Sequence, residues 1–85
     1  GLVVNLIELN ISHNNIEKLC EKMFYKLEKL TILDLSYNPI YLIEANSISY
    51  NQLLTNLFLN FKSVDQIFET KLFEFYFVNY TQSLK

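Results

Sequence analysis

The stretch LIELNISHNNI at residues 6–16 returns as LTILDLSYNPI at residues 30–40 and, less closely, as LTNLFLNFKSV at residues 54–64, each copy 24 residues after the last. Together with the residues that follow them, the three copies define 21 positions that the pattern requires to be apolar, and 20 of these are apolar; only Asn51 is not. A chain that is 51% hydrophobic would fill about 11 such positions by chance. The fixed period therefore predicts a stack of similar structural units.

Each copy contains apolar residues two positions apart, which predict a short strand with both side chains on one side. These pairs are Leu9 and Ile11, Leu33 and Leu35, and Leu57 and Leu59. Parallel strands require a long return connection, and the rest of each copy can provide it while burying further apolar side chains. The sequence thus predicts one short strand per turn of chain, joined to its neighbours in a parallel sheet.

The pattern L-x-x-L-x-L-x-x-N-x-I in residues 6–16 and 30–40 resembles the leucine-rich repeat family, and the 24-residue length resembles its typical class, found in extracellular receptors such as the Toll-like receptors. The resemblance implies an α/β fold: a right-handed β/α solenoid of about three full repeats with a short parallel sheet on its concave face. The repeats would span about residues 6–29, 30–53 and 54–77, with partial coils at 1–5 and 78–85. No capping repeat is visible at either end. We therefore expect a single segment with uncapped ends, as a fragment of a longer solenoid, a truncated product or a piece that stacks against a partner.

Asn14 and Asn38 stand where the chain leaves the strand and turns. An asparagine side chain carries two donors and an acceptor, and it tolerates tight turns. The resemblance implies that both asparagines form a buried ladder that hydrogen-bonds neighbouring backbones. Lys62 takes this place in the third copy; because it cannot accept a hydrogen bond and is rarely buried, we expect an irregular turn there with the ammonium in solvent. Asn51 also departs from the pattern, at a position where receptor-type repeats often tolerate asparagine.

The residues that alternate with the buried ones face outward and form a candidate binding surface. They are Glu8, Asn10, Ser12, His13, Ile32, Asp34, Ser36, Tyr37, Asn56, Phe58, Asn60 and Phe61. The repeat period arranges them in columns, among them His13–Tyr37–Phe61 and Asn10–Asp34–Phe58. Aromatic side chains among small polar ones are typical of binding surfaces, although stacked aromatics also simply stabilise neighbouring strands. The candidate contacts with a protein or other macromolecular ligand are His13, Asp34, Tyr37, Phe58 and Phe61, with Ile32, Tyr37, Phe58 and Phe61 expected to be exposed.

The resemblance implies a non-enzymatic recognition module that is part of a receptor-like, innate-immune or cell-surface protein, and the size of this surface limits what the chain can bind alone. Its flat area is about 200 Å², against about 800 Å² per partner in a standard interface. We therefore expect weak binding by this chain alone and a contribution to the binding face of a longer receptor. Two alternatives stay open: a structural piece that stacks or self-associates through exposed coil ends, and an intracellular leucine-rich-repeat scaffold.

Composition argues against several other classes of protein. The net charge is −2 and every basic residue is lysine, which argues against nucleic-acid binding. No apolar run approaches the length of about 20 residues that spans a membrane. One histidine, one cysteine and scattered carboxylates predict no metal site, and Gly1 as the single glycine rules out a glycine-rich phosphate loop. We expect no cofactor and no enzyme activity, because the repeat places His13 and Cys20 on different faces of the coil.

Two short motifs bear on localisation. Asn10-Ile-Ser12 and Asn79-Tyr-Thr81 fit the N-glycosylation acceptor, and Asn79 is preferred because a glycan on Asn10 would block the outward face. They favour an extracellular or cell-surface protein. Cys20 leaves a cytoplasmic location as the alternative; we expect it to fill the core, with a free thiol that pairs between chains as the other reading.

The C-terminal part of the third copy can be read in two ways. Residues 65–78 can form a helix, because the apolar residues from Val64 to Phe75 have a passable helical spacing, whereas FEFYFV at residues 73–78 alternates as a strand does. Such a stretch with one charge would be a dimerisation edge or an aggregation hazard if it were unpaired.

Overall fold

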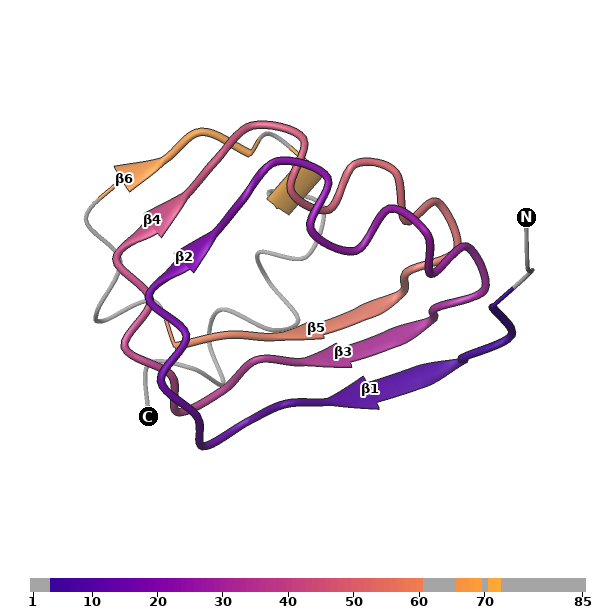
Figure 1. The fold of residues 1–85 in the computed structure, drawn as a ribbon, viewed down its shortest axis with the longest axis horizontal. Helices are drawn as coiled ribbons and strands as arrows, with labels where there is room; N and C mark the ends of the chain where they lie inside the picture. The colour runs from indigo at the N-terminus through magenta and orange to yellow at the C-terminus, as the bar shows by residue number, and fades with distance from the viewer. Residues whose placement is uncertain (1–3, 61–65, 70, 73–85) are drawn as a thin grey trace.

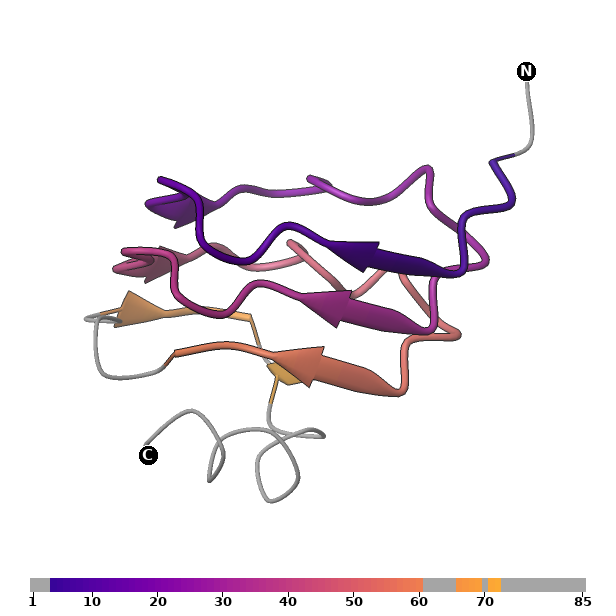
Figure 2. The ribbon, with the colours of Figure 1, turned by 90° about the horizontal axis from the view of Figure 1, so that it is seen from below.

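A computed structural model describes residues 4–60, 66–69, 71 and 72 of the 85-residue chain. The described strands, in chain order, are β1 (Glu8–Asn10), β2 (Lys18–Leu19), β3 (Ile32–Asp34), β4 (Leu42–Ile43), β5 (Asn56–Phe58) and β6 (Gln66–Ile67) (Figure 1). They form two parallel sheets with the orders β1-β3-β5 and β2-β4-β6. The chain therefore alternates between the sheets, and each return adds a strand beside the previous one (Figure 2).

The pairing register follows the sequence period. Leu9 pairs with Leu33, and Leu33 pairs with Leu57. In the other sheet Leu19 pairs with Ile43, and Ile43 pairs with Ile67. The prediction of short parallel strands that recur at the repeat period is thus confirmed, and the three leucines lie in one row across the sheet.

The β2-β4-β6 sheet was not predicted. The sequence predicted one strand per turn of chain, and the structure has two. The return segments are held by hydrogen bonds from Tyr41 N to Glu17 O (2.9 Å) and from Glu44 N to Leu19 O (2.9 Å). Strands of two residues are too short to leave an alternating pattern. The described residues contain no α-helix, and the helical component expected of an α/β fold is reduced, in this part of the chain, to a 3₁₀ turn at Lys71 and Leu72. Most of residues 64–78, with their two readings, lies outside the described residues.

The core lies between the two sheets and is made almost entirely of the repeated apolar positions. Its buried members are Leu19, Phe24, Leu30, Leu33, Leu35, Ile40, Ile43, Ile48, Leu54, Leu57, Leu59 and Leu72. Full burial of a leucine or isoleucine side chain contributes about 1.5–3 kcal/mol to folding. Because no single turn can enclose these side chains, the stability of each turn depends on its neighbours.

Burial is most complete in the middle turn. Leu30 and Leu33 are fully buried, whereas the equivalent Leu6 is 38% exposed and Leu9 is half-buried. The reason is that β3 lies between β1 and β5, while β1 has a described neighbour on one side only. The same substitution should therefore cost less free energy in the first turn than in the second.

Candidate functional site

One face of the β1-β3-β5 sheet points away from the core, and we call it the outer face. Its strand residues are Glu8, Asn10, Ile32, Asp34, Asn56 and Phe58. They alternate with Leu33 and Leu57, whose side chains are buried, so they point to the opposite side. The register sets Asn10, Asp34 and Phe58 side by side, as the sequence period predicts.

Two equivalent turns fix polar side chains at the end of β1 and β3. Asn10 Oδ1 accepts hydrogen bonds from Ser12 N (3.0 Å) and Ser12 Oγ (2.6 Å). Asp34 Oδ1 accepts hydrogen bonds from Ser36 N (3.0 Å) and Ser36 Oγ (2.5 Å). Asparagine and aspartate stabilise turns in this way because the short side chain reaches the backbone two residues on. The Asp34 carboxylate is thereby held in one orientation on the outer face.

His13 and Tyr37 follow these turns and form an aromatic stack. Their ring centroids are 4.4 Å apart and the ring planes are inclined by 11°. Both residues have a left-handed backbone with φ of 57°, which costs free energy for residues other than glycine, asparagine and aspartate. Two hydrogen bonds to the next turn hold this conformation. His13 N donates to Ser36 O (3.0 Å), and Tyr37 N donates to the side-chain oxygen Oδ1 of Asn60 (3.0 Å).

Tyr37 is the most exposed large apolar side chain described on the outer face, at 64%. Ile32 and Phe58 were expected to be exposed and are half-buried instead. Phe61, the third expected member of the aromatic column, lies outside the described residues. Among described positions, the accessible aromatic surface of this face thus centres on the His13–Tyr37 stack.

Asn38 is buried and links the first two turns through five polar contacts. Its Nδ2 donates to Ile11 O (3.0 Å), Leu35 O (2.9 Å) and Ser36 O (3.3 Å). Its Oδ1 accepts hydrogen bonds from the backbone N atoms of Asn14 (3.0 Å) and Ile16 (3.2 Å). This one side chain thus closes its own turn and satisfies backbone groups of the turn before it.

Asn14 differs from Asn38, although both were expected to be buried. Asn14 is exposed, and its Nδ2 donates only to Ile11 O (2.9 Å) and Ser12 O (3.0 Å) within its own turn. The difference arises because Asn14 belongs to the turn that has a described neighbour on one side. Lys62, the third residue in this series, lies outside the described residues.

Asn51 provides a second link between the first two turns, which the sequence did not predict. The residue is fully buried, and its Nδ2 donates to Phe24 O (2.8 Å) and Leu27 O (3.1 Å) of the previous turn. Lys71 Nζ in turn donates to Asn51 O (2.6 Å). The available signal was the break in the pattern itself, since most buried polar side chains make at least one hydrogen bond.

Glu69 is a second buried polar residue that the sequence did not single out. Its side chain is 2% exposed, and it accepts hydrogen bonds from Ile48 N (3.1 Å) and Lys71 N (3.0 Å). Glu69 thereby ties the last described turn to the middle one.

Cys20 and Asn10 are both exposed in the structure. Cys20 is a free, exposed cysteine, so the expectation that it fills the core is wrong: it follows buried Leu19 in β2 and points the other way. Asn10 is exposed on the outer face. Asn79, the preferred glycosylation candidate, lies outside the described residues.

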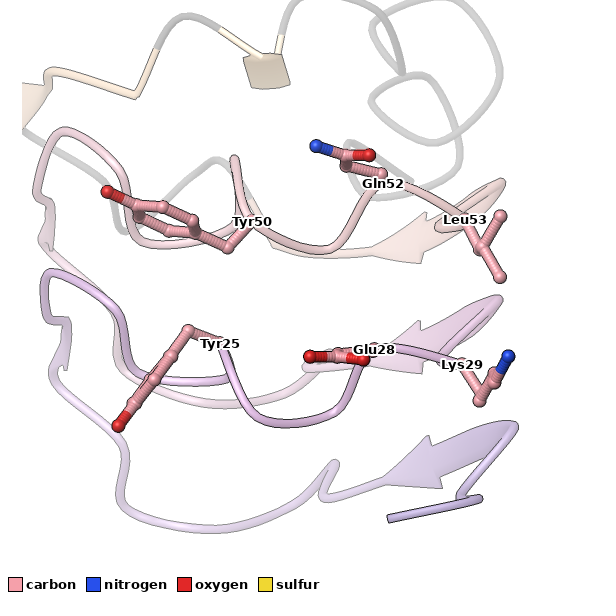
Figure 3. Close-up of a pocket in the computed structure, with 6 residues that line it drawn as sticks. All are labelled: Tyr25, Glu28, Lys29, Tyr50, Gln52 and Leu53. Atoms are coloured by element: carbon pink, nitrogen blue, oxygen red, sulfur yellow. The ribbon is translucent and has the colours of Figure 1, made fainter. Parts of the chain in front are cut away.

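A hollow of about 420 Å³ lies away from the outer face, where two return segments run side by side (Figure 3). Its lining residues are Tyr25, Glu28, Lys29, Tyr50, Gln52 and Leu53. The ammonium group of Lys26 lies 5.8 Å from the ring centroid of Tyr25, and that of Lys22 lies 5.9 Å from that of Tyr50. Such cation–π contacts on the surface stabilise the local arrangement by about 0.5–1 kcal/mol each. No residue of this hollow belongs to the outer face.

Two further properties hold for the part of the chain that the structure describes. No group of three or more His, Cys, Asp and Glu residues there is placed to hold a metal ion. Nor does that part contain a helix long and apolar enough to cross a membrane.

Comparison with known proteins gives one family match. The model of the family described as "Leucine rich repeat" matches residues 4–63, which is more than half of the chain. Among curated proteins and solved structures, none matches the chain significantly.

Proposed function

Since the chain belongs to the leucine-rich repeat family, whose repeats generally mediate protein–protein recognition, we propose that it is a recognition module that binds a protein partner through the outer face. The family is typically non-enzymatic, and the proposal includes no catalytic step. In this proposal the outer face is the concave face of a right-handed solenoid of three repeats, and the module is part of a receptor-like protein.

The His13–Tyr37 stack carries this proposal. A tyrosine that is 64% exposed on a sheet of small polar residues offers a large contact area, and aromatic side chains are enriched among the residues that dominate binding energy. The stack restricts the ring before binding, since the two planes lie nearly parallel. A partner that covers Tyr37 therefore loses less side-chain entropy than it would with a freely rotating ring.

The left-handed backbone at His13 and Tyr37 also supports the proposal, although Lys22 and Asn46, away from the outer face, share this conformation. Such conformations in non-glycine residues cluster at binding sites, where the surrounding structure maintains them. Here the same conformation occurs in two successive turns with φ of 57° at both residues. It sets both rings at the end of the strands, beyond the Ser12 and Ser36 turns that precede them.

Selection from a displayed library of random peptides tests the proposal. The intact chain is immobilised, and peptides that bind it are compared with those that bind the variants Tyr37→Ser and Tyr25→Ser. Both tyrosines are exposed, but Tyr25 lines the hollow in Figure 3 and not the outer face. We expect enriched peptides that lose binding to Tyr37→Ser and keep it with Tyr25→Ser. Peptides that are indifferent to Tyr37, or a library that yields no enriched peptide, would overturn the proposal.

For localisation we propose the cell surface or extracellular space, with the acceptor triplets at Asn79, the preferred one, and Asn10 as support. The alternative is an intracellular scaffold, and exposed Cys20 favours it, because reducing compartments preserve free thiols. Expression through a secretory pathway separates the two. A glycan on the chain, removed by a glycosidase, supports the first proposal; a secreted chain that misfolds or cross-links through Cys20 supports the second.

A further inference from the structure

The charges of the described residues are distributed unevenly between the two sides of the molecule. On the outer face, Glu8 and Asp34 are the charged residues of the described strands, and no described lysine lies there. The described lysines stand on β2 or in the segments that follow β2 and β6: Lys18, Lys22, Lys26, Lys29 and Lys71. The potential over the described outer face is therefore negative, and it favours a partner of the opposite sign.

The surroundings of Asp34 are aromatic as well as acidic. Phe58 is its partner in the register between β3 and β5. Tyr37, stacked on His13, follows three residues later, after the Ser36 turn. Aromatic rings attract cations to their faces, so the carboxylate and the rings favour the same kind of ligand group. An acidic side chain would be repelled by Asp34 and by the negatively polarised faces of the rings.

The Asp34 carboxylate is also oriented in advance. Its hydrogen bonds with described residues, from Ser36 N and Ser36 Oγ, both go to Oδ1. An arginine or lysine of a partner would then bond to a carboxylate whose rotamer is already fixed, which lowers the entropic cost of forming the pair. Asp34 is half-buried, so the pair would be less screened by salt than one in full contact with water.

From these observations we infer that the outer face binds a protein segment through a lysine or arginine side chain, which docks at Asp34 beside the His13–Tyr37 stack and Phe58. This inference rests on the proposed function and names the chemistry of its partner. The partner's cationic group bonds to the carboxylate, and its aliphatic stem covers the aromatic rings. A neighbouring apolar side chain of the same segment can then cover the rest of Tyr37.

The peptide selection described above tests the inference when two further variants are added. Asp34→Asn keeps the shape of the side chain and an oxygen that Ser36 can reach, but removes the charge. Glu44→Gln removes a charge from an exposed residue outside the outer face, just after β4, and is the matched control. Unfolding of each variant in urea is followed first, so that a loss of binding is not confused with a loss of fold.

The expected result is a set of Tyr37-dependent peptides enriched in lysine or arginine. Their affinity should fall about fivefold or more with Asp34→Asn, should fall as salt concentration rises, and should be unchanged with Glu44→Gln. Tyr37-dependent peptides that are neutral or acidic, or that bind Asp34→Asn as well as the original chain, would overturn the inference and leave the proposed function standing. Peptides that ignore both Tyr37 and Asp34 would overturn both.

Discussion

The side-chain amide of Asn51 donates a hydrogen bond of 2.8 Å to the carbonyl oxygen of Phe24, which lies 27 positions earlier in the chain. The bond joins two successive turns at the point where the return segment leads back to the next strand. Asn38 joins the same two turns where the chain leaves the β1-β3-β5 sheet. Two buried amides therefore hold these turns together at both ends of that sheet.

Replacing Asn51 by leucine should destabilise the chain, although it restores the apolar pattern. The substitution leaves Phe24 O and Leu27 O without their side-chain donor, and we expect the free energy of unfolding to fall by about 2 kcal/mol. Urea denaturation measures it. Gln52→Leu, at the exposed neighbouring position, is the control and should change stability little. An Asn51→Leu variant as stable as the original chain would show that the amide contributes nothing.

Asn38→Ala should cost more than Asn14→Ala. The first change removes five polar contacts of a buried residue, and we expect a loss of about 2–4 kcal/mol. The second removes two hydrogen bonds on an exposed residue, and we expect a loss below about 1 kcal/mol. Thermal and urea unfolding of both variants give the comparison, and equal losses would contradict the different roles of buried Asn38 and exposed Asn14.

A similar contrast applies to the leucines of the strands. Leu33→Ala creates a cavity between two neighbouring turns and should lower the free energy of unfolding by about 3–5 kcal/mol. Leu9→Ala, at a half-buried position, should lower it by about 1–2 kcal/mol, because water already reaches part of the side chain. The prediction fails if the two variants unfold at the same urea concentration.

Lys22→Asn should stabilise the chain slightly. Lys22 has φ of 58°, and Asn46, the equivalent residue of the next turn, has φ of 62°. Relief of the left-handed strain is worth about 1 kcal/mol, and loss of the contact with Tyr50 costs about 0.5 kcal/mol. We expect a net gain of about 0.5 kcal/mol, visible as a higher melting temperature. Lys26→Asn, which relieves no such strain, should show no gain.

Cys20 should react with a thiol reagent in the folded chain. The residue is exposed, so the native chain should be modified at nearly the rate of the urea-unfolded chain. Mass spectrometry under native conditions follows the reaction, and Cys20→Ser should leave stability unchanged. Protection of the thiol in the folded chain would contradict the exposure that the structure gives.

The part of the fold that the sequence predicted is the part set by repeated apolar side chains. Leu9, Leu33 and Leu57 were expected to form one row, and they do. The β2-β4-β6 sheet was missed because its pairing depends on backbone groups of two-residue strands, which leave no side-chain pattern. The different burial of Asn14 and Asn38 was missed for another reason: a period marks equivalent positions, but it does not say which turns have neighbours on both sides.

The sequence predicted which residues of the candidate site lie side by side, but not their backbone conformation or hydrogen bonds. The period put His13 beside Tyr37 and Asp34 beside Phe58 from spacing alone. It gave no indication of the left-handed backbone at His13 and Tyr37, nor of the serine hydrogen bonds that orient Asp34. Those features depend on local turn geometry, which a pattern of apolar residues does not encode.

Pairing in both sheets at a constant separation of 24 residues has a consequence for the lengths that this chain can accept. Deleting a single residue between β3 and β4 would leave Leu42 and Ile43 one step out of phase with β2 and would turn a core side chain toward water. Adding an entire unit of the same length would preserve every backbone pair on both sides. Insertions and deletions of whole 24-residue units are therefore tolerated best, because they preserve the pairing in both sheets.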